Sequence, residues 1–315
     1  MDKTFGVLAY PHSDNLGDFI QSLAAAQWLK DEKIQPLDRD QLHDYTGPQI
    51  RLVMNGWFME SPKNWPPSDK ILPLFTSFHL NPTARREMLT AEGVAYLKKH
   101  QPIGCRDFYT QNLLQGYGIE TYFSACLTLS LNRTDYVEKN QKRNGIYVIS
   151  PMERLNPEND PDPKGFLKKG IQVLKKPFKK KRYSKAISRL QNFLVPQSEE
   201  IHYNSQLRDP KVFSEEERID AAKQQLKAIA TARLVITSRI HTALPAVAFG
   251  TPVLFLSDGL EHPNQKSRLE GMESFFPIVN SRDLDQWEST FPEPNQAHHP
   301  FVEKFKKEIL RFLNE

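Results

Sequence analysis

Short apolar runs alternate with amphipathic segments along the whole chain, and this alternation constrains the fold more than any other feature. In the first half, strands are predicted at residues 5–10, 51–55, 72–78, 102–105 and 120–123, and helices at 18–30, 81–100 and 107–116. Strands that alternate with helices form parallel sheets covered by helices. The sequence therefore predicts an α/β fold, and it disfavours β-sandwiches and helix bundles.

The chain is long enough for two domains, because 315 residues can build two cores of ordinary size. Residues 132–144 are almost free of apolar side chains, so we expect a first domain over residues 1–140 and a second over 141–315. In the second domain, strands are expected at 145–150, 199–203, 233–237 and 253–256, and helices at 184–194, 242–249 and 301–313. A further helix starts at Ser214 through a capping box with Glu217.

The amino acid composition indicates an intracellular protein. No stretch reaches the roughly 18 apolar residues that cross a bilayer, and the amino terminus shows no export signal. The chain has 2 cysteines, Cys105 and Cys126, and such a pair is typical of buried small side chains in a reducing compartment. We therefore expect a cytoplasmic protein.

The formal net charge of +4 is too small to indicate a nucleic-acid binder, but the charge is unevenly distributed. A Pro-rich segment at 153–165, expected to be a loop, leads into the stretch from Lys168 to Lys185, which is rich in basic residues and has no acidic one. One interpretation is a solvated surface or a mobile loop. The other is a contact for anionic lipid headgroups or a pyrophosphate-linked glycolipid, which would make the protein peripheral at the inner membrane face.

The first candidate site follows the first predicted strand, where a polar loop leads into an Ala-rich helix. Gly17 lets the backbone turn, and Asp18 is expected to cap the helix, with Gln21 completing a capping box. Ligands of open α/β sheets bind outside the carboxyl ends of the strands. Asn15, Gly17 and Asp18 are therefore expected to face a ligand, unless Asp18 is only a cap and Asn15 only a turn residue.

The second candidate site lies between the strand at 233–237 and the helix at 242–249. Ser238, Arg239 and His241 stand there in an otherwise apolar segment. Arginine presents a fork of donors that suits carboxylate or phosphate, and a helix amino terminus adds a partial positive charge. Because histidine can carry a proton near neutral pH, the group predicts an anion pocket beside a proton carrier. The alternative is a structural ion pair at Arg239 and a buried core histidine at 241.

These residues resemble the signatures of the polysaccharide pyruvyl transferase family. One signature is Asn15-Leu16-Gly17-Asp18 before a helix, and another is Ser238-Arg239-Ile240-His241, followed by a small-residue helix and Gly250-Thr251-Pro252-Val253. A third element of the family, a mid-chain Arg-Asp pair after an apolar strand, is similar to Arg106-Asp107, and the resemblance implies that this pair lies with Asn15 and Gly17 on the acceptor side or in the cleft. The chain departs from the family at Ser124-Ala125-Cys126-Leu127, where many relatives have an acidic residue followed by Pro.

The resemblance implies two Rossmann-like domains that face each other across a cleft, similar to the B-type glycosyltransferases. It places the acceptor on the first domain and the donor on the second, with the last helix packing back on the first domain. Arg239, Ser238 and a second arginine, Arg154, would hold phosphoenolpyruvate. His241 would be the acid, and Asp18 the base or the anchor of the acceptor.

The activity implied is transfer of a pyruvyl group to hydroxyls of a saccharide, or of a lipid-linked oligosaccharide, in surface or exopolysaccharide biosynthesis. The resemblance implies phosphoenolpyruvate as the co-substrate. No metal or nucleotide-binding motif is present, so we expect neither a metal nor another cofactor. Two alternatives remain. One is a B-type glycosyltransferase that uses a nucleotide-sugar, and the other is a non-catalytic saccharide-binding member of a polymer assembly complex.

Overall fold

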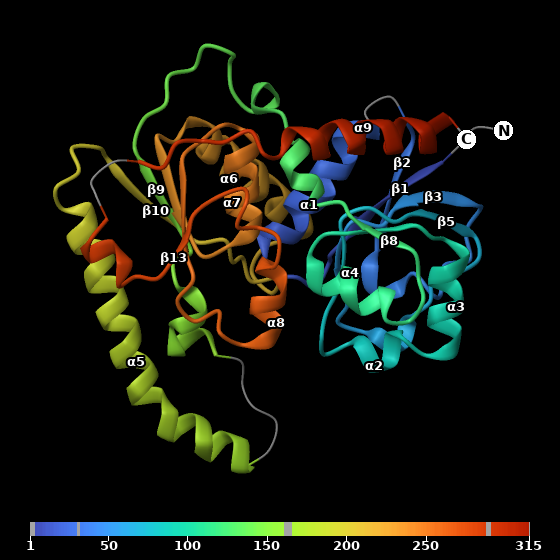
Figure 1. Ribbon diagram of the computed structural model, residues 1–315, viewed down its shortest axis with the longest axis horizontal. Helices are drawn as coiled ribbons and strands as arrows, with labels where there is room; N and C mark the ends of the chain where they lie inside the picture. Colours follow the sequence, from blue (N-terminus) through green and yellow to red (C-terminus); the bar gives the residue numbers. More distant parts are fainter. Residues whose placement is uncertain (1–3, 30–31, 161–165, 288–290, 315) are drawn as a thin grey trace.

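The computed structural model describes residues 4–29, 32–160, 166–287 and 291–314, and the side chains of 166–172 also lie outside the described set. Its sheets are parallel and are covered by helices (Figure 1). We call the part built on β1 to β8 the first half and the part built on β9 to β13 the second half. The α/β fold predicted from the sequence is confirmed.

The first half contains two linked sheets. One has the order β2–β1–β3–β5, formed by Ile34–Asp38, Phe5–Ala9, Ile50–Val53 and Ile71–Leu74. The other has the order β4–β6–β7–β8, formed by Gly56–Phe58, Phe78–Leu80, Ile103–Cys105 and Thr121–Phe123. The backbone N–H of Gly104 donates to the carbonyl of Phe75 at 3.1 Å, at the end of β5, so the two sheets meet there. The helices are α1 (Leu16–Ala26), α2 (Arg85–Met88), α3 (Ala91–Lys99) and α4 (Phe108–Gln115).

Three sequence predictions for the first half need correction. The strand predicted at 72–78 is divided into β5 and β6, because Ser77 adopts a left-handed backbone conformation with φ of 57° between them. The helix predicted at 81–100 is divided into α2 and α3, because Thr90 caps a new helix by accepting from the backbone N–H of Gly93. The strands β2 and β4 were not predicted.

The second half is built on one sheet with the order β10–β9–β11–β12–β13. Its strands are Ile201–Asn204, Ile146–Ile149, Leu234–Thr237, Val253–Leu256 and Ile278–Val279. Its helices are α5 (Phe166–Leu194), α6 (Glu215–Thr231), α7 (Ile240–Ala248), α8 (Pro263–Lys266) and α9 (His299–Asn314). The predicted capping box of Ser214 and Glu217 begins α6.

The basic stretch is helical, and most of its described side chains are exposed, so it is a solvated surface rather than a loop. It lies in α5, which begins well before the helix predicted at 184–194. Lysine and leucine are good helix formers, and a run of positive charge does not by itself prevent a helix. Within the stretch, Lys168 and Lys169 have side chains outside the described set.

The last helix lies on the first half. Arg51 of β3 donates from Nη1 to the carbonyl of Phe312 in α9 at 2.8 Å, and the Tyr122 hydroxyl donates to Glu308 Oε2 at 2.7 Å. Figure 1 shows α9 starting near the junction of the two halves, above α1, and running over the first half, with its end near β1, β2 and β3. The chain therefore returns to the first half after completing the second.

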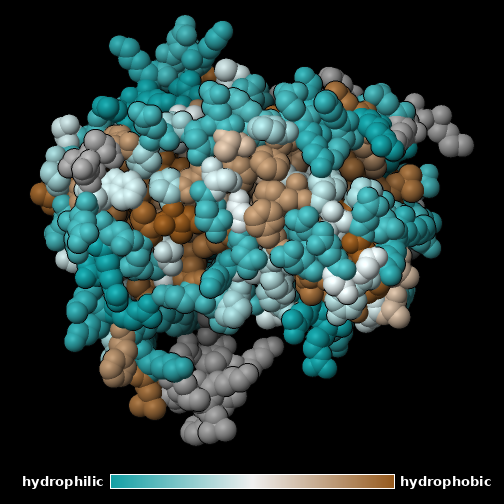
Figure 2. Space-filling view, in the orientation of Figure 1, coloured by the Kyte–Doolittle hydropathy of each residue, from teal (hydrophilic) through white to brown (hydrophobic). Residues whose placement is uncertain are grey.

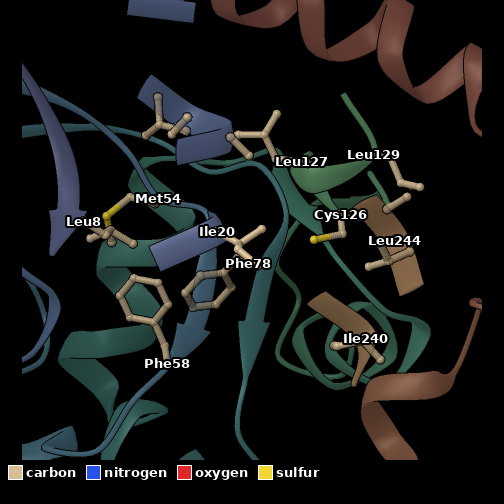
Figure 3. Close-up of a cluster of buried hydrophobic side chains, with 14 of the residues drawn as sticks. Leu8, Ile20, Met54, Phe58, Phe78, Cys126, Leu127, Leu129, Ile240 and Leu244 are labelled. Carbon is tan, nitrogen blue, oxygen red and sulfur yellow. The ribbon is translucent and has the colours of Figure 1, made fainter. Parts of the chain in front are cut away.

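The two halves share one apolar core. Ile20 of α1 and Leu244 of α7 belong to the same buried cluster as residues of the first-half strands. Figure 3 shows this cluster, with side chains of Leu8, Ile20, Met54, Phe58, Phe78, Leu127, Ile240 and Leu244. Because α1 and α7 both pack into it, their amino termini are held close together, and both candidate sites lie at these termini.

Candidate active site

A cleft of about 670 Å³ lies between the two halves. The first half contributes the loop after β1 and the region after β2, and the second contributes η6 (Glu153–Leu155), Arg239 and Arg268. A narrower recess of about 20 Å³, lined by His241 and Ser238, shares Arg154, Arg239 and Arg268 with the cleft. Facing Rossmann-like halves with a cleft between them are thus present.

The two walls of the cleft carry opposite charges. The wall of the first half presents carboxylates, and the wall of the second presents guanidinium groups. The carboxylates of the first half are Asp14, Asp18, Asp38, Asp40 and Glu60, where Arg39 pairs with Asp40, and the guanidinium groups of the second half are those of Arg154, Arg239 and Arg268, where Glu153 pairs with Arg239. Partial burial and the charge of Asp18 raise the pKa of Asp14, whereas Arg239 acts across the cleft to lower it. A ligand in the cleft therefore lies between an acidic and a basic surface.

Asn15, rather than Asp18, caps α1, which corrects the sequence prediction. Its Oδ1 accepts from the backbone N–H of Gly17 at 3.1 Å and from Gln206 Nε2 at 2.8 Å. Since Gln206 belongs to the second half, one amide both caps the helix and links the halves. The backbone adds a second link there, because the N–H of Leu16 donates to the carbonyl of Gln206 at 2.9 Å.

Asp18 lies in the first turn of α1 and lines the cleft. Its Oδ2 accepts from the Ser13 hydroxyl at 2.6 Å, and its Oδ1 accepts from Gln21 Nε2 at 3.3 Å. These hydrogen bonds fix the carboxylate in place. Because it is only partly buried, its carboxylate is accessible from the cleft, and its contact with a ligand stays a prediction.

Gly17 allows His241 to approach α1 closely. A Cβ on residue 17 would lie 2.9 Å from both Cβ and Nδ1 of His241, and 2.7 Å from Gln206 Nε2. Contacts this short do not occur between unshifted atoms, so a larger residue would displace the imidazole or the amide. Gly17 is needed for this close packing, in addition to the turn that the sequence indicated.

His241 is buried at the start of α7, with non-helical backbone angles of φ −82° and ψ 15°. Arg106 Nη1 is 3.4 Å from its Nε2. An arginine can only donate, so Nε2 acts as the acceptor and the proton of the neutral ring is on Nδ1. Burial lowers the pKa of His241 well below its usual range, and the charges of Arg106 and Arg268 lower it further. Without a ligand, the imidazole is neutral.

Arg239 is the N-cap residue of α7 and pairs with a carboxylate of its own half. Its Nη2 lies 2.6 Å and its Nε 2.9 Å from Glu153 Oε2. The ion pair that the sequence left open is thus present. It holds the guanidinium at the cleft, and among the described residues its Nη1 has no hydrogen-bond partner, which leaves donors for an anion.

Ser238 lies beside Arg239, but its hydroxyl forms hydrogen bonds with backbone groups. Its Oγ donates to the carbonyl of Leu256 at 2.6 Å and accepts from the N–H of Met152 at 2.7 Å. It thereby ties the ends of β9 and β12 together below the recess. Its direct contact with a donor stays a prediction.

Two more arginines enlarge the basic wall. Arg154, predicted as the second donor ligand, is exposed and lines both the cleft and the recess. Arg268, which the sequence did not indicate, lines both as well, and its buried Nε has no hydrogen-bond partner among the described residues. Burial and the charge of Arg106 lower the pKa of Arg268 to about 9, which still leaves it positively charged at neutral pH.

Arg106 and Asp107 are fully buried behind the cleft. Arg106 Nη1 donates to Gln21 Oε1 at 2.9 Å, so this arginine connects α1 to His241. Asp107 caps α4 and accepts from His79 Nδ1 at 2.5 Å. Burial opposes ionisation of Asp107, but His79 and Arg106 outweigh it and lower its pKa, while burial lowers the pKa of His79 to about 4. Neither Arg106 nor Asp107 lines the cleft, so both act as supports of His241.

The departure from the family pattern at Ser124 has a structural role. Its hydroxyl accepts from the backbone N–H of Ser77 at 2.9 Å and lies 3.0 Å from the carbonyl of Cys105. It thus joins the turn between β5 and β6 to β7. Cys105 and Cys126 are both buried free thiols.

Sequence reasoning missed Gln206, Glu153, Arg268 and His79. None belongs to a recognised motif, because each reaches the site through tertiary packing. Only Gln206 had a position that indicates a site residue, and that indication was weak: it is a polar residue just after the strand predicted at 199–203.

Two structural observations bear on ligands and location. Within the described ranges, no group of three His, Cys, Asp or Glu side chains could hold a metal ion. In the same ranges, no helix combines the length and the apolar character needed to cross a bilayer. The expectation that the protein uses no metal stays a prediction.

The fold and site define an α/β protein with two halves that face each other across a charged cleft. The profile of the polysaccharide pyruvyl transferase family matches residues 15–259, which is more than half of the chain and includes every motif residue discussed above. The protein belongs to this family. No curated protein sequence matches the chain.

Several solved structures are similar to the chain. An uncharacterised protein from Klebsiella pneumoniae has 10% identity and a TM-score of 0.49, over 89% of this chain and 93% of that one. UDP-GlcNAc 2-epimerase from Methanocaldococcus jannaschii has 9% identity and a TM-score of 0.43, over 98% and 99%. The wall teichoic acid polymerase TagF has 9% identity and a TM-score of 0.41, over 99% and 83%. At these values the likenesses add nothing to the description of the site.

Proposed function

We propose that the protein transfers a pyruvyl group from phosphoenolpyruvate to hydroxyls of a saccharide and forms a ketal in the synthesis of a surface polysaccharide. Membership of the family supports this proposal. The structural observation that carries it is the cleft itself, in which Arg154, Arg239 and Arg268 face the carboxylate of Asp18. The basic wall suits an anionic donor, and the acidic wall suits the hydroxyls of an acceptor.

The donor is proposed to bind against the second half. Phosphoenolpyruvate carries a carboxylate and a phosphate, and guanidinium groups bind both through paired hydrogen bonds. A recess of about 20 Å³ is roughly the size of one water molecule, so the body of the donor is proposed to lie in the larger cleft, with its methylene carbon directed at the recess that His241 lines. There it can reach the free donors of Arg239 and Arg268 together with the amino terminus of α7.

The reaction balances without a net proton. The bond between C2 of the donor and its phosphate oxygen breaks, and two bonds form from C2 to acceptor oxygens. The two hydroxyl protons are replaced by one proton on the new methyl group and one on the released phosphate. The protein therefore needs one group that delivers a proton to the methylene carbon and one that accepts a hydroxyl proton.

His241 is the proposed proton donor, provided that its imidazole gains a proton when the anionic donor binds. The ring is neutral without a ligand because burial, and then the charges of Arg106 and Arg268, lower the pKa of His241. A bound trianion offsets those charges and raises the pKa of His241, so the imidazole can take up a proton together with the donor. The separation of 3.4 Å from Arg106 is long for a hydrogen bond, and a small rotation frees Nε2.

Asp18 is the proposed base. It stands on the opposite wall, and its two hydrogen bonds to Ser13 and Gln21 hold the carboxylate toward the cleft. A carboxylate so placed can accept the proton of the attacking hydroxyl. The acceptor is proposed to be a saccharide, free or linked to a lipid.

Titration of three ligands tests the proposal against its alternatives. Phosphoenolpyruvate alone should raise the melting temperature, and His241→Gln should still bind it while losing about 100-fold to 10,000-fold in transfer rate. A shift with a nucleotide-sugar and none with phosphoenolpyruvate would favour a glycosyltransferase. Binding of saccharide alone would favour a non-catalytic member of an assembly complex.

A further inference from the structure

The first part of α5 exposes large apolar side chains far from the cleft. Val173, Leu174 and Phe178 are 69%, 73% and 74% exposed. Figure 2 shows tan and brown atoms among teal ones at the lower left of the molecule, where Figure 1 places α5. We call these three residues the apolar face of α5. Later in the same helix, Ala186, Leu190 and Leu194 are buried in the core of the second half, so only the first part is uncovered.

Cations flank the apolar face. Leu174 and Phe178 are four residues apart and share one side of the helix, because a turn takes about 3.6 residues. Of the exposed basic residues that follow, Lys175, Lys176 and Lys180 lie on the other sides of the helix, whereas Lys181, Arg182 and Lys185 continue along the side of Leu174 and Phe178. Val173 lies about 100° away around the helix. Residues 173–180 thus have an apolar side, centred on Leu174 and Phe178, and a basic side, and cations extend the apolar side toward the end of the helix.

Ion pairs hold this part of α5 in place. Lys179 pairs with Asp160, and Arg182 Nη2 lies 2.7 Å from Glu261 Oε1. The segment that contains Asp160 follows η6, which carries Glu153 and Arg154 of the basic wall. The apolar face is therefore fixed relative to the cleft.

We propose that α5 docks on a membrane surface that contains anionic lipids, with the apolar face in the interface and the lysines at the headgroups. Helices with Leu or Phe on one side and Lys or Arg on the other are typical of this position. A protein partner fits less well, because lysine is depleted in protein interfaces. The net positive charge of the helix selects anionic headgroups.

This docking does not depend on the proposed transfer reaction, since membrane binding can be measured without a donor or an acceptor. If an experiment rules out either membrane docking or the transfer reaction, the other can still be tested.

Sedimentation of the full chain with lipid vesicles tests the docking. The protein should pellet with phosphatidylglycerol vesicles at low salt, should stay in solution with phosphatidylcholine vesicles, and should dissociate as salt screens the charges. Leu174→Ser combined with Phe178→Ser should lower the affinity at least tenfold. Lys175→Gln, Lys180→Gln and Lys181→Gln together should do the same. Val212→Ser is the matched control, because Val212 is 70% exposed outside α5.

Circular dichroism and melting temperature should match those of the wild type for every variant. The proposal is overturned if the wild type does not pellet with anionic vesicles, or if the serine variant binds them as well as the control does. It is also overturned if the wild type self-associates through this face, which ultracentrifugation would show as a dimer that the serine variant cannot form.

Discussion

Replacing Gly17 by alanine perturbs the contact between the two motif loops with a single methyl group. The new Cβ would lie 2.9 Å from His241 Nδ1 and 2.7 Å from Gln206 Nε2. Ordinary contacts of this kind begin about 0.5 Å further apart. Both neighbours are tied to other groups, Gln206 to Asn15 and His241 to the start of α7. The imidazole must therefore shift by a few tenths of an ångström or more.

The expected effect on activity exceeds the effect on stability. A misplacement of about 1 Å in an active site can cost about 100-fold in rate, so we expect Gly17→Ala to lower kcat/KM by roughly 10-fold to 100-fold. Overpacking costs about 1–3 kcal/mol, and the higher helix propensity of alanine offsets up to about 1 kcal/mol. The free energy of unfolding should thus fall by no more than about 3 kcal/mol.

Phosphate release from phosphoenolpyruvate in the presence of acceptor, together with urea unfolding, measures both effects. Gly116→Ala is the matched control, since Gly116 is an exposed helix terminus with ordinary backbone angles. A Gly17→Ala enzyme with kcat/KM within threefold of the wild type would show that the close packing against His241 does not matter for catalysis.

Three further changes have defined outcomes. Arg239→Lys should raise the KM for phosphoenolpyruvate because a point charge replaces a guanidinium fork, and an unchanged KM in steady-state kinetics would remove Arg239 from the donor site. Asp18→Asn should lower kcat by about 100-fold or more and leave donor affinity unchanged in calorimetry, whereas equal loss of both would make Asp18 a donor ligand. The folded state holds His79 neutral with a pKa of about 4, while the unfolded chain protonates it near pH 6.5, so the free energy of unfolding should decrease as pH falls between these values. His79 alone should contribute up to about 1.4 kcal/mol per pH unit, and urea unfolding of His79→Gln should show a flatter pH dependence over that range.

The sequence located the site because the motif residues stand where strands end and helices begin. Arg239 and His241 follow β11 at the start of α7, and Gly17 and Asp18 lie in the first turn of α1 after β1. In a parallel fold these positions converge at the same edge of the sheets. The local sequence pattern was therefore enough to predict that Asp18 and Arg239 line one cleft.

The sequence could not assign residues whose role comes from distant contacts. Asn15 caps α1 in place of Asp18, and it does so while bound to Gln206 at 2.8 Å, more than 100 residues away. Glu153 is the ion-pair partner of Arg239, and it lies in the segment 153–165, which was predicted to be a loop. The start of α5 was also missed, because the many lysines around Leu174 and Phe178 indicated a solvated surface or a loop, and the helical spacing of these two residues was overlooked. Local propensity carries no information on such pairs.

The measurement that tests the central claim most directly is transfer itself. The protein is incubated with phosphoenolpyruvate and acceptors that contain galactose, mannose or glucosamine, and both released phosphate and acceptor mass are followed. The account predicts that one acceptor gains the mass of one pyruvic acid less one water for each phosphate released, and that His241→Gln produces neither. Binding of phosphoenolpyruvate without any mass gain, or phosphate release without a modified acceptor, would contradict it.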